Sequence, residues 1–369
     1  MPLNLFKKLT KKIKTSSALK EQKGISQPEM TSQDSIDRIK KKRTNQISAD
    51  ALAHDILKGN ITALSRGITL VESKNKDHLN EANALIMKCL PYANQSIRIG
   101  ITGVPGVGKS TFIETFGNLL ISLGRKVAVL AIDPSSSLSK GSILGDKTRM
   151  EDLVKQPNAF IRPSASGETL GGVARKTRES IILCEAAGFN IIIIETVGVG
   201  QSETAVHSMV DFFLLLKISG AGDELQGIKR GIMEMADAVV INKADGDNIQ
   251  KAKMAQIEFN RALHLFPMKD SDWQPKVTTC SSLTLDGISE VYEIILDYIS
   301  KTNQSGYFNS NREAQNQYWM METINEQLKN SFYQHPEIIK ELESVKKQVV
   351  QHKISPFLGA KHLLELFKK

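Results

Sequence analysis

A run of residues in the first third of the chain has the composition of a loop that holds phosphate groups. The run is Gly103, Val104, Pro105, Gly106, Val107, Gly108, Lys109, Ser110 and Thr111. It follows an apolar segment, Ile97–Ile101, and matches the GxxxxGK[ST] phosphate loop in its strand-before-helix setting. The glycines let backbone N–H groups approach the phosphates, Lys109 brings a cation to the β- and γ-phosphates, and Ser110 offers a hydroxyl to Mg²⁺. With every fixed position present, nucleotide binding is favoured over a chance glycine-rich turn.

A second motif predicts that the base is guanine. Asn242, Lys243 and Asp245 form an NKxD sequence directly after the apolar segment Ala238–Ile241. The carboxyl end of a strand is where open α/β sheets bind ligands. The Asp245 carboxylate can accept hydrogen bonds from the ring N–H and the exocyclic amine of guanine, whereas adenine would leave it unpaired. The stem of Lys243 can cover the base, and Asn242 can tie loops together.

A third site would complete the pocket for the base. The segment Val277–Thr279 reads as a further strand, and Ser281, Ser282 and Leu283 follow it closely. GTPases of this kind place a backbone N–H here that binds the guanine oxygen. The three sites agree, and they predict GTP and GDP as the ligands.

Acidic residues could hold a magnesium ion beside the phosphates. Glu195 follows the apolar segment Ile191–Ile194 and occupies the Walker-B position, which holds Mg²⁺ directly or through water. Asp133 closes another strand-like segment, and Asp146 lies in the loop beyond it. Taken singly, each aspartate is more typical of a helix cap or a surface acid. Together with Ser110 and Glu195, they predict an acidic magnesium site.

The residues that carry out hydrolysis are less evident from the sequence. Lys109 and Glu195 are the expected catalytic groups, and Gln201 is the first residue to test for orienting the attacking water. No general base stands out, so intrinsic turnover is expected to be slow unless a partner completes the site. Gly220–Gly227 follows another strand and is either a flexible surface loop or a switch that senses a partner.

Short apolar segments alternate with helical patterns from residue 96 onward. Strands that are buried on both faces read as continuous apolar runs, which is typical of a parallel sheet covered by helices. The predicted fold class is α/β, a three-layer P-loop NTPase fold with a mostly parallel sheet. The expected strands are Ile97–Ile101, Val127–Ile132, Ala159–Ile161, Ile191–Ile194, Phe212–Ile218, Ala238–Ile241 and Val277–Thr279.

Helical patterns flank the predicted sheet. Ser48–Cys89 reads as N-terminal helices, with Ser48 as an N-cap and Gly59 as a stop. The C-terminal part is helical with breaks at Pro336 and Pro356, and its expected apolar anchors are Trp319, Met320, Leu328 and Phe332. The predicted divisions are a basic arm (1–47), a helical segment (48–95), a P-loop GTPase domain (96–302) and a C-terminal helical arm (303–369).

The net charge of +8 belongs to the beginning of the chain. The 369 residues are 41% hydrophobic and 24% charged, an ordinary globular composition. Residues 1–45 hold twelve Lys or Arg and four Asp or Glu, which accounts for the whole excess. No nucleic-acid partner is therefore expected for the body of the protein. No apolar run approaches the roughly 18 residues of a membrane span, so no membrane partner is expected either.

The basic arm and the cysteines indicate the cellular compartment in which the protein is expected. The Lys, Ser and Gln content of the arm favours a solvated disordered tail. A mitochondrial transit peptide is the alternative, because no acid precedes Glu21, although such peptides are usually Arg-rich. Contact with anionic membranes or RNA is the weakest of the three readings. Cys89, Cys184 and Cys280 are odd in number and far apart, which fits a reducing compartment. The expected location is cytoplasmic, with the mitochondrial matrix as the alternative.

These motifs and the sequence around them resemble the methylmalonyl-CoA mutase-associated GTPases, the MeaB/ArgK/MMAA group. The resemblance extends from residue 48 to the C-terminus, and Glu195 in place of the usual Asp agrees with it. Ser282 stands where many relatives have Ala, and the basic arm matches no motif of the family. The segments that carry the resemblance are Leu57–Ser73, Gly103–Thr111, Asp133–Ser136, Gly141–Met150, Arg162–Gly172, Glu195–Glu203, Gly220–Gly231 and Asn242–Asp245.

The resemblance implies a SIMIBI-class P-loop fold whose C-terminal helical arm makes a homodimer. It also implies a GTP-driven chaperone for an adenosylcobalamin-dependent acyl-CoA mutase such as methylmalonyl-CoA mutase. In this role the GTPase gates cofactor loading and protects the mutase from inactivation. Its switches would be Gly141–Met150, Glu195–Glu203 and Gly220–Gly231.

Other functions stay open at this point. Asn242–Asp245 argues against an ATP-dependent kinase of a transport system, and tighter binding of ATP than of GTP would reverse that judgement. A nickel metallochaperone GTPase of related fold needs a His/Cys cluster, which the sequence does not show. A nucleic-acid-binding GTPase that uses the basic arm would lose a salt-sensitive RNA interaction on removal of residues 1–45.

Overall fold

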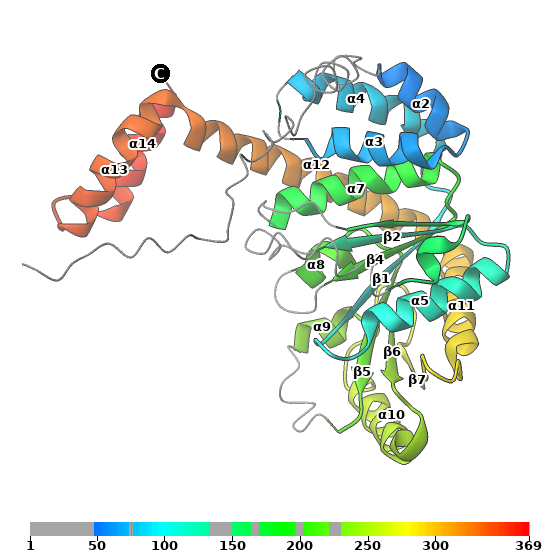
Figure 1. The fold of residues 1–369 in the computed structure, drawn as a ribbon. Coiled ribbons are helices and arrows are strands. Elements are labelled where there is room, and N and C mark those ends of the chain that lie inside the picture. The colour runs from blue at the N-terminus through cyan, green and yellow to red at the C-terminus, as the bar shows by residue number, and fades with distance from the viewer. Residues whose placement is uncertain are drawn as a thin grey trace, which may run out of the picture. The chain divides into compact units, whose positions relative to one another are not determined.

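Among the residues that the structure describes, seven strands form one parallel sheet (Figure 1). The computed structural model describes residues 48–73, 75, 77–132, 150–163, 170–196, 202–220 and 230–368. The strand order is β3-β2-β4-β1-β5-β6-β7, and every neighbouring pair is parallel. This arrangement confirms the predicted α/β class and each expected strand. The strands are β1 Ile97–Gly103, β2 Val127–Ile132, β3 Ala159–Arg162, β4 Ile191–Thr196, β5 Phe212–Ile218, β6 Ala238–Asn242 and β7 Lys276–Thr279.

Both faces of the sheet are buried. Successive side chains of a strand point to opposite faces, so one strand contributes to the hydrophobic core on each side. In β4, Ile192 and Ile194 pack into one hydrophobic core, and Ile191 and Ile193 pack into the other. All four side chains are at most 1% exposed. The continuous apolar run of this strand therefore reflects helices on both sides, as the sequence predicted.

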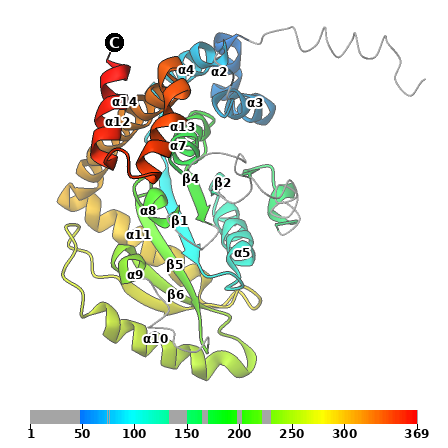
Figure 2. The ribbon, with the colours of Figure 1, turned by 90° about the vertical axis from the view of Figure 1, so that its left-hand side faces the viewer.

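Helices form a layer on each face of the sheet. On one face, α5 and α11 pack in the same core as Ile191 and Ile193. On the other face, α7 and α8 cover the sheet, and α2, α3 and α4 stack outside α7 (Figures 1 and 2). The helices are α2 Ala49–Leu57, α3 Ile61–Val71, α4 Asp77–Cys89, α5 Lys109–Ser122, α7 Leu170–Ala186, α8 Ser202–His207, α9 Arg230–Met235, α10 Ile249–Leu263 and α11 Ile288–Ser305, with 3₁₀ turns η1 Leu90–Tyr92, η2 Leu153–Lys155 and η3 Gly246–Asn248.

The first N-terminal helix, α2, begins and ends where the sequence predicted, whereas α4 begins at Asp77, two residues before the expected Leu79. The hydroxyl of Ser48 accepts a hydrogen bond from the backbone N–H of Ala51 (3.3 Å), so Ser48 is the N-cap of α2. Gly59 follows the end of α2 with φ of 77°, a conformation that glycine adopts without strain. Leu64 and Ile68 of α3 are fully buried in the core that α7 shares. No helix of the described part of the chain is long and apolar enough to cross a bilayer.

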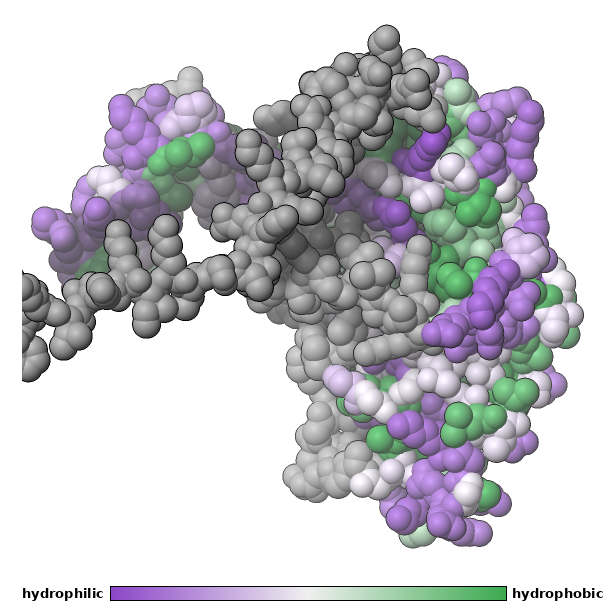
Figure 3. All heavy atoms as spheres, viewed as in Figure 1, coloured by the Kyte–Doolittle hydropathy of each residue, from purple (hydrophilic) through white to green (hydrophobic). Residues whose placement is uncertain are grey.

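Three further helices form the C-terminal arm, residues 307–367. They are α12 Tyr307–Gln334, α13 Pro336–Val350 and α14 Pro356–Phe367, and the two prolines open α13 and α14 as predicted. Trp319 is buried, and its indole N–H donates to the Ser208 carbonyl (3.0 Å). The expectation that Met320 and Leu328 are anchors is wrong for the single chain, because they are 58% and 60% exposed. Figure 3 shows further hydrophobic surface on the arm.

Candidate nucleotide site

The phosphate loop follows the central strand β1 without a break. β1 ends at Gly103, where a Cβ would lie 2.6 Å from the carbonyl oxygen of Leu216 on the neighbouring strand β5, so only glycine fits. Gly108 has φ of 92°, and a Cβ there would lie 2.9 Å from Nδ2 of Asn242. These two glycines let the backbone turn tightly against its neighbours before α5 begins at Lys109. The loop therefore presents backbone N–H groups and the start of a long helix at the carboxyl edge of the sheet, a setting suited to phosphate.

The Lys109 side chain lies along the loop rather than in solvent. Its ammonium donates to the carbonyl oxygens of Gly103 (2.8 Å) and Val104 (3.5 Å), and the residue is 9% exposed. Burial lowers the pKa of Lys109, while the negative charges of Glu195 and Glu203 act in the opposite direction. Since carbonyl dipoles are weaker partners than ionised phosphate, this ammonium can exchange them for a bound phosphate group.

The predicted guanine loop lies directly against the phosphate loop. Asn242 ends β6 and donates through its side chain to the Val107 carbonyl (3.0 Å), and the ammonium of Lys243 donates to the Gly106 carbonyl (2.9 Å). Lys243 has φ of 59°, so its backbone turns sharply at this contact. The fold thus brings together two motifs that are more than one hundred residues apart in the sequence. Asp245 follows on the same loop and is partly exposed.

The third predicted segment supports Asp245. The hydroxyl of Ser281 donates to Oδ2 of Asp245 (2.6 Å), which holds the carboxylate in place. The hydroxyl of Ser282 donates to Oδ1 of Asn242 (3.1 Å), and the Ser282 carbonyl accepts from the hydroxyl of Thr115 (3.1 Å). The backbone N–H of Leu283 donates to the Ser281 hydroxyl (3.2 Å), and its side chain is exposed. The predicted serines therefore orient the residues that can recognise the base.

The proposed magnesium residues are only partly within the described structure. The hydroxyl of Ser110 donates to Oε1 of Glu195 (3.4 Å), so these two oxygen donors meet beside the phosphate loop. Asp133, Asp146 and Gln201 lie outside the residues that the structure describes. Within the described ranges there is no cluster of three or more His, Cys, Asp or Glu side chains able to hold a metal. The pair nevertheless offers the hard oxygen ligands that Mg²⁺ prefers.

One acidic residue near Lys109 was not singled out by the sequence. Glu203 is 2% exposed at the beginning of α8, and its charge acts on Lys109. The sequence placed it only at the end of the segment Glu195–Glu203. Nothing in residue spacing indicates that its side chain turns inward, because that depends on how α8 packs on β1 and β4.

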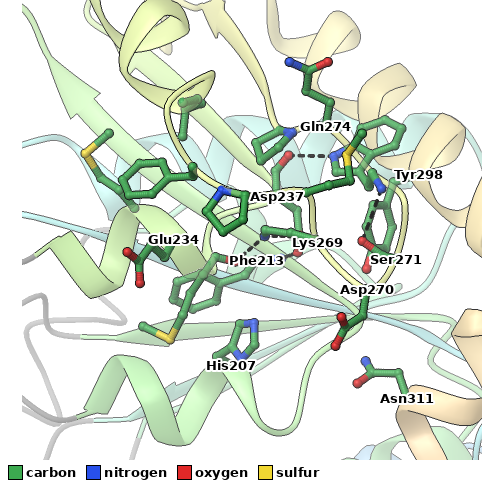
Figure 4. A pocket seen from close by; sticks show the side chains of 18 of the residues that line it. His207, Phe213, Glu234, Asp237, Lys269, Asp270, Ser271, Gln274, Tyr298 and Asn311 are labelled. Atoms are coloured by element: carbon green, nitrogen blue, oxygen red, sulfur yellow. Dashed lines mark hydrogen bonds and ion pairs between the residues drawn. The ribbon is translucent and has the colours of Figure 1, made fainter.

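A separate cavity of about 550 Å³ lies at the opposite edge of the sheet (Figure 4). Phe213 of β5 and Asp237, just before β6, lie in its wall, so it faces the amino ends of the strands. Lys269 fixes this wall by donating to the carbonyls of Met235 and Ala236 and to the Asp237 carboxylate, all within 2.8 Å. None of the predicted nucleotide residues lines the cavity. It is therefore distinct from the nucleotide site.

A parallel sheet whose central strand runs into a GxxxxGK[ST] loop, with an NKxD loop hydrogen-bonded beside it, defines a P-loop GTPase. Comparison with protein families agrees with this class. The family described as methylmalonyl Co-A mutase-associated GTPase MeaB matches residues 64–337, and the chain belongs to it. The resemblance stated from the sequence is confirmed. The chain is accordingly a GTPase, which binds guanine nucleotide and hydrolyses GTP to GDP and phosphate.

Individual relatives agree with the family. A Caulobacter vibrioides protein described as a GTPase is 48% identical over 321 residues, which cover 87% of this chain and 98% of the relative. The Mus musculus protein named methylmalonic aciduria type A homolog, mitochondrial, is 44% identical over 329 residues, which cover 86% of this chain and 79% of the relative. A solved crystal structure described as LAO/AO transport system kinase is 37% identical, with a TM-score of 0.71, and covers 88% of this chain and 99% of that one.

Proposed function

We propose that this GTPase is a chaperone for an adenosylcobalamin-dependent acyl-CoA mutase such as methylmalonyl-CoA mutase. GTP binding and hydrolysis gate the loading of adenosylcobalamin into the mutase and protect it from inactivation. The family match over residues 64–337 carries the proposal, because the family is described by its association with that mutase. Hydrolysis then serves as a timing step, and intrinsic turnover is slow until the partner binds.

The chain's own residues divide the work on the nucleotide. Asp245, held by Ser281, accepts hydrogen bonds from guanine, and the phosphate loop with Lys109 binds the phosphates. Ser110 and Glu195 fit a magnesium ion, since both present oxygen atoms at the phosphate loop. When bound, Mg²⁺ supplies positive charge at the β- and γ-phosphate oxygens. Asp133, Asp146 and Gln201 stay candidates for completing this site.

α8 is the element that can pass the nucleotide state to the C-terminal arm. Glu203, at its beginning, acts electrostatically on Lys109. Beyond its other end, the Ser208 carbonyl accepts from the indole N–H of Trp319 (3.0 Å), and the Val210 carbonyl accepts from the Gln315 amide (2.8 Å). A shift of α8 on nucleotide exchange must therefore strain or move α12. A chaperone gated by nucleotide requires an element of this kind, which is near the nucleotide at one end and contacts the partner-binding arm at the other.

The C-terminal arm is the proposed site of homodimerisation. It exposes apolar side chains along its whole length, and exposed apolar surface of this extent favours contact with another protein chain. The exposed apolar residues of the arm are Tyr318, Met320, Met321, Ile324, Leu328, Tyr333, Ile339, Val350, Phe357, Leu358 and Leu364. Light scattering of the full chain is expected to give a dimer, which Phe357→Glu converts to a monomer. Leu265→Glu is the matched control, because Leu265, at 85%, is as exposed as Phe357 at 86% but lies beyond α10.

The chaperone role is tested with purified methylmalonyl-CoA mutase. The chain is mixed with the mutase in the presence of GDP, GTP or a non-hydrolysable GTP analogue. Complex formation, adenosylcobalamin transfer and the inactivation rate of the mutase are then measured. We expect complex stability and cofactor transfer to depend on the nucleotide, and mutase inactivation to slow. Absence of a complex in every nucleotide state, with unchanged mutase behaviour, would overturn the proposal.

A base-switched variant supplies the control for nucleotide gating. Asp245→Asn is expected to lose the response to GTP and to regain it with xanthosine triphosphate, because the amide can donate to the extra oxygen of xanthine. Restoration of mutase protection by xanthosine triphosphate alone would show that this site drives the effect. If the variant protects the mutase with no nucleotide present, mutase protection does not depend on GTP binding.

A further inference from the structure

Glu203 is a buried carboxylate whose hydrogen-bonding capacity is not fully used. The residue is 2% exposed, and its Oε2 atom is buried without a hydrogen-bond partner among the described residues. The adjacent Ser202 hydroxyl is also buried and unpaired there. Burying an ionised carboxylate without a full set of partners is unfavourable, so such groups are rare and concentrate at functional sites. The unused oxygen therefore calls for a partner that arrives with the substrate.

The position of Glu203 points to the phosphate end of the substrate. α8 packs on β1, which leads into the phosphate loop, and on β4, which contains Glu195 near its carboxyl end. Burial lowers the pKa of Lys109, and the negative charge of Glu203 acts against this shift together with that of Glu195, so Glu203 lies close enough to Lys109 for their charges to interact. Lys109 and Glu203 make no direct ion pair in the described structure, since the Lys109 ammonium bonds to loop carbonyls instead.

The other acid of the site already has an assigned contact. Glu195 accepts from the Ser110 hydroxyl and is the proposed magnesium residue. A γ-phosphate bound by Lys109 would lie near Glu203, because the charge of Glu203 acts on the same ammonium. A carboxylate there cannot bind the phosphate itself, because both are negative. It can accept a hydrogen bond from a water molecule that lies beside the γ-phosphate.

We infer that the Glu203 carboxylate binds the attacking water and is the catalytic base of GTP hydrolysis in this chain. The inference rests on the burial of Glu203, its unpaired oxygen and the packing of α8 on β1 and β4. It assigns the base that the sequence did not identify. It applies to the GTPase reaction and does not depend on the chaperone role.

The reaction balances with this assignment. The water oxygen forms a bond to the γ-phosphorus, and the bond between that phosphorus and the bridging oxygen of the β-phosphate breaks. The bonding electrons leave with GDP. Glu203 accepts a proton from the water and returns it to the inorganic phosphate before release, so the carboxylate is regenerated.

The test is single-turnover hydrolysis by Glu203→Gln and Glu203→Asp with Mg²⁺ and radiolabelled GTP. The amide keeps the size of the side chain but cannot take a proton, so the rate is expected to fall by about 100-fold or more. Aspartate keeps the carboxylate and is expected to restore part of the rate. Affinities for GTP and GDP, measured with fluorescent analogues, are expected to change less than about threefold, because the carboxylate contacts water rather than nucleotide.

Thermal unfolding separates catalysis from structure. Replacing an incompletely paired buried charge by a neutral group of the same size should leave the melting temperature of the nucleotide-free protein unchanged or raised. Ser208→Ala, at the other end of the α8 segment, is the matched control and should hydrolyse GTP at the wild-type rate. A Glu203→Gln variant with a wild-type rate would overturn the inference. So would a parallel loss of rate and nucleotide affinity, or a loss of rate that accompanies a clearly lower melting temperature.

Discussion

Asn242 and Val107, 135 residues apart, are joined by a hydrogen bond of 3.0 Å from the Asn242 side-chain amide to the Val107 carbonyl. The same side chain accepts from the Ser282 hydroxyl and the Cys280 thiol through its Oδ1 atom. One buried amide thus ties the phosphate loop to both segments of the base site. Because these loops are held together by the protein itself, guanine and phosphate recognition can be preorganised as one unit.

Replacing that amide is expected to uncouple the two ends of the nucleotide site. Asn242→Ala leaves the buried Val107 carbonyl unpaired, which costs roughly 1–3 kcal/mol of folding free energy. GTP and GDP affinities are expected to fall by about tenfold or more, as measured by fluorescence titration. Asn303→Ala is the control, since Asn303 is exposed and its side-chain amide donates only to the Ile299 carbonyl of its own helix, α11, among the described residues. Unchanged affinity in Asn242→Ala would show that the contact with Val107 is dispensable.

Asp245 is expected to determine the choice of base. Its Oδ2 atom accepts from Ser281 at 2.6 Å, so the carboxylate has little freedom to turn away from the nucleotide. Asp245→Asn should weaken GTP binding by about 100-fold, because a site built for guanine donors would then present a donor of its own. Xanthosine triphosphate should bind this variant better than GTP does in a competition assay. GTP affinity equal to wild type would place the base elsewhere.

Much of this architecture could be predicted because it depends on local signals. The apolar runs gave all seven strands of the described sheet, and Ser48, Pro336 and Pro356 marked helix starts correctly. The phosphate and base motifs also lie at the carboxyl ends of strands, as the sequence predicted. In a parallel sheet the carboxyl ends share one edge, so two motifs that follow strands must face the same side.

Other features depend on distant packing and could not be read from spacing. The inward side chain of Glu203 depends on how α8 seats on the sheet. Met320 and Leu328 looked like core residues, but α12 turns them outward. The pairing of Asp211 with Arg312 joins residues about one hundred positions apart, and neither side chain lies in a recognisable motif. The placements of Asp133, Asp146 and Gln201 lie outside the described residues and stay predictions.

Lys109 is expected to support function at the expense of stability. Burial lowers its pKa, and Glu195 and Glu203 offset this only in part. Because the pKa is lower in the folded state than in the unfolded state, the protonated lysine destabilises the fold at every pH below the folded-state pKa. This cost disappears as the pH rises above the unfolded-state pKa. Lys109→Met should therefore unfold at the same or a higher temperature near neutral pH, while single-turnover hydrolysis falls by about 100-fold or more.

The pH dependence provides the check on this account of Lys109. Any stability gain of Lys109→Met over wild type, measured by urea unfolding without nucleotide, should shrink as the pH is raised toward the unfolded-state pKa of lysine. The wild-type protein should in turn gain more from added GDP than the variant does. A variant that is less stable at neutral pH would mean that the contacts of the ammonium with Gly103 and Val104 outweigh its burial.

The cysteine thiols are expected to be inert in the folded protein. Cys89, Cys184 and Cys280 are at most 1% exposed. Burial raises the pKa of Cys89 to about 11 and that of Cys280 to about 12, and it also raises the pKa of Cys184. Labelling at pH 8, followed by mass spectrometry, should be at least about 100-fold slower in native protein than in urea. Rapid labelling of one thiol would identify a local opening, and nucleotide should slow it if that thiol is Cys280.

Arg312 is expected to make the largest single contribution to fixing α12 on the sheet. Its guanidinium binds both carboxylate oxygens of Asp211 at 2.7 Å and also donates to the carbonyls of Asn94 and Ser96. Burial lowers the pKa of Arg312, but the hydrogen bond and the charge of Asp211 together raise it above its usual value. Arg312→Met leaves Asp211 buried without its positively charged partner, although the backbone N–H of Arg98 still donates to it (2.8 Å). This loss should cost roughly 3–5 kcal/mol in urea unfolding.

An exposed ion pair provides the comparison for Arg312. Lys276 and Asp297 are also paired, at 2.6 Å, but their side chains are 46% and 56% exposed. Lys276→Met should therefore cost less than about 1 kcal/mol, because water screens the charge that remains. If α12 links α8 to the rest of the arm, Arg312→Met should also weaken the dependence of dimer or mutase binding on GTP. Similar losses of stability in the two variants would mean that burial of the Arg312–Asp211 pair does not control the attachment of the arm.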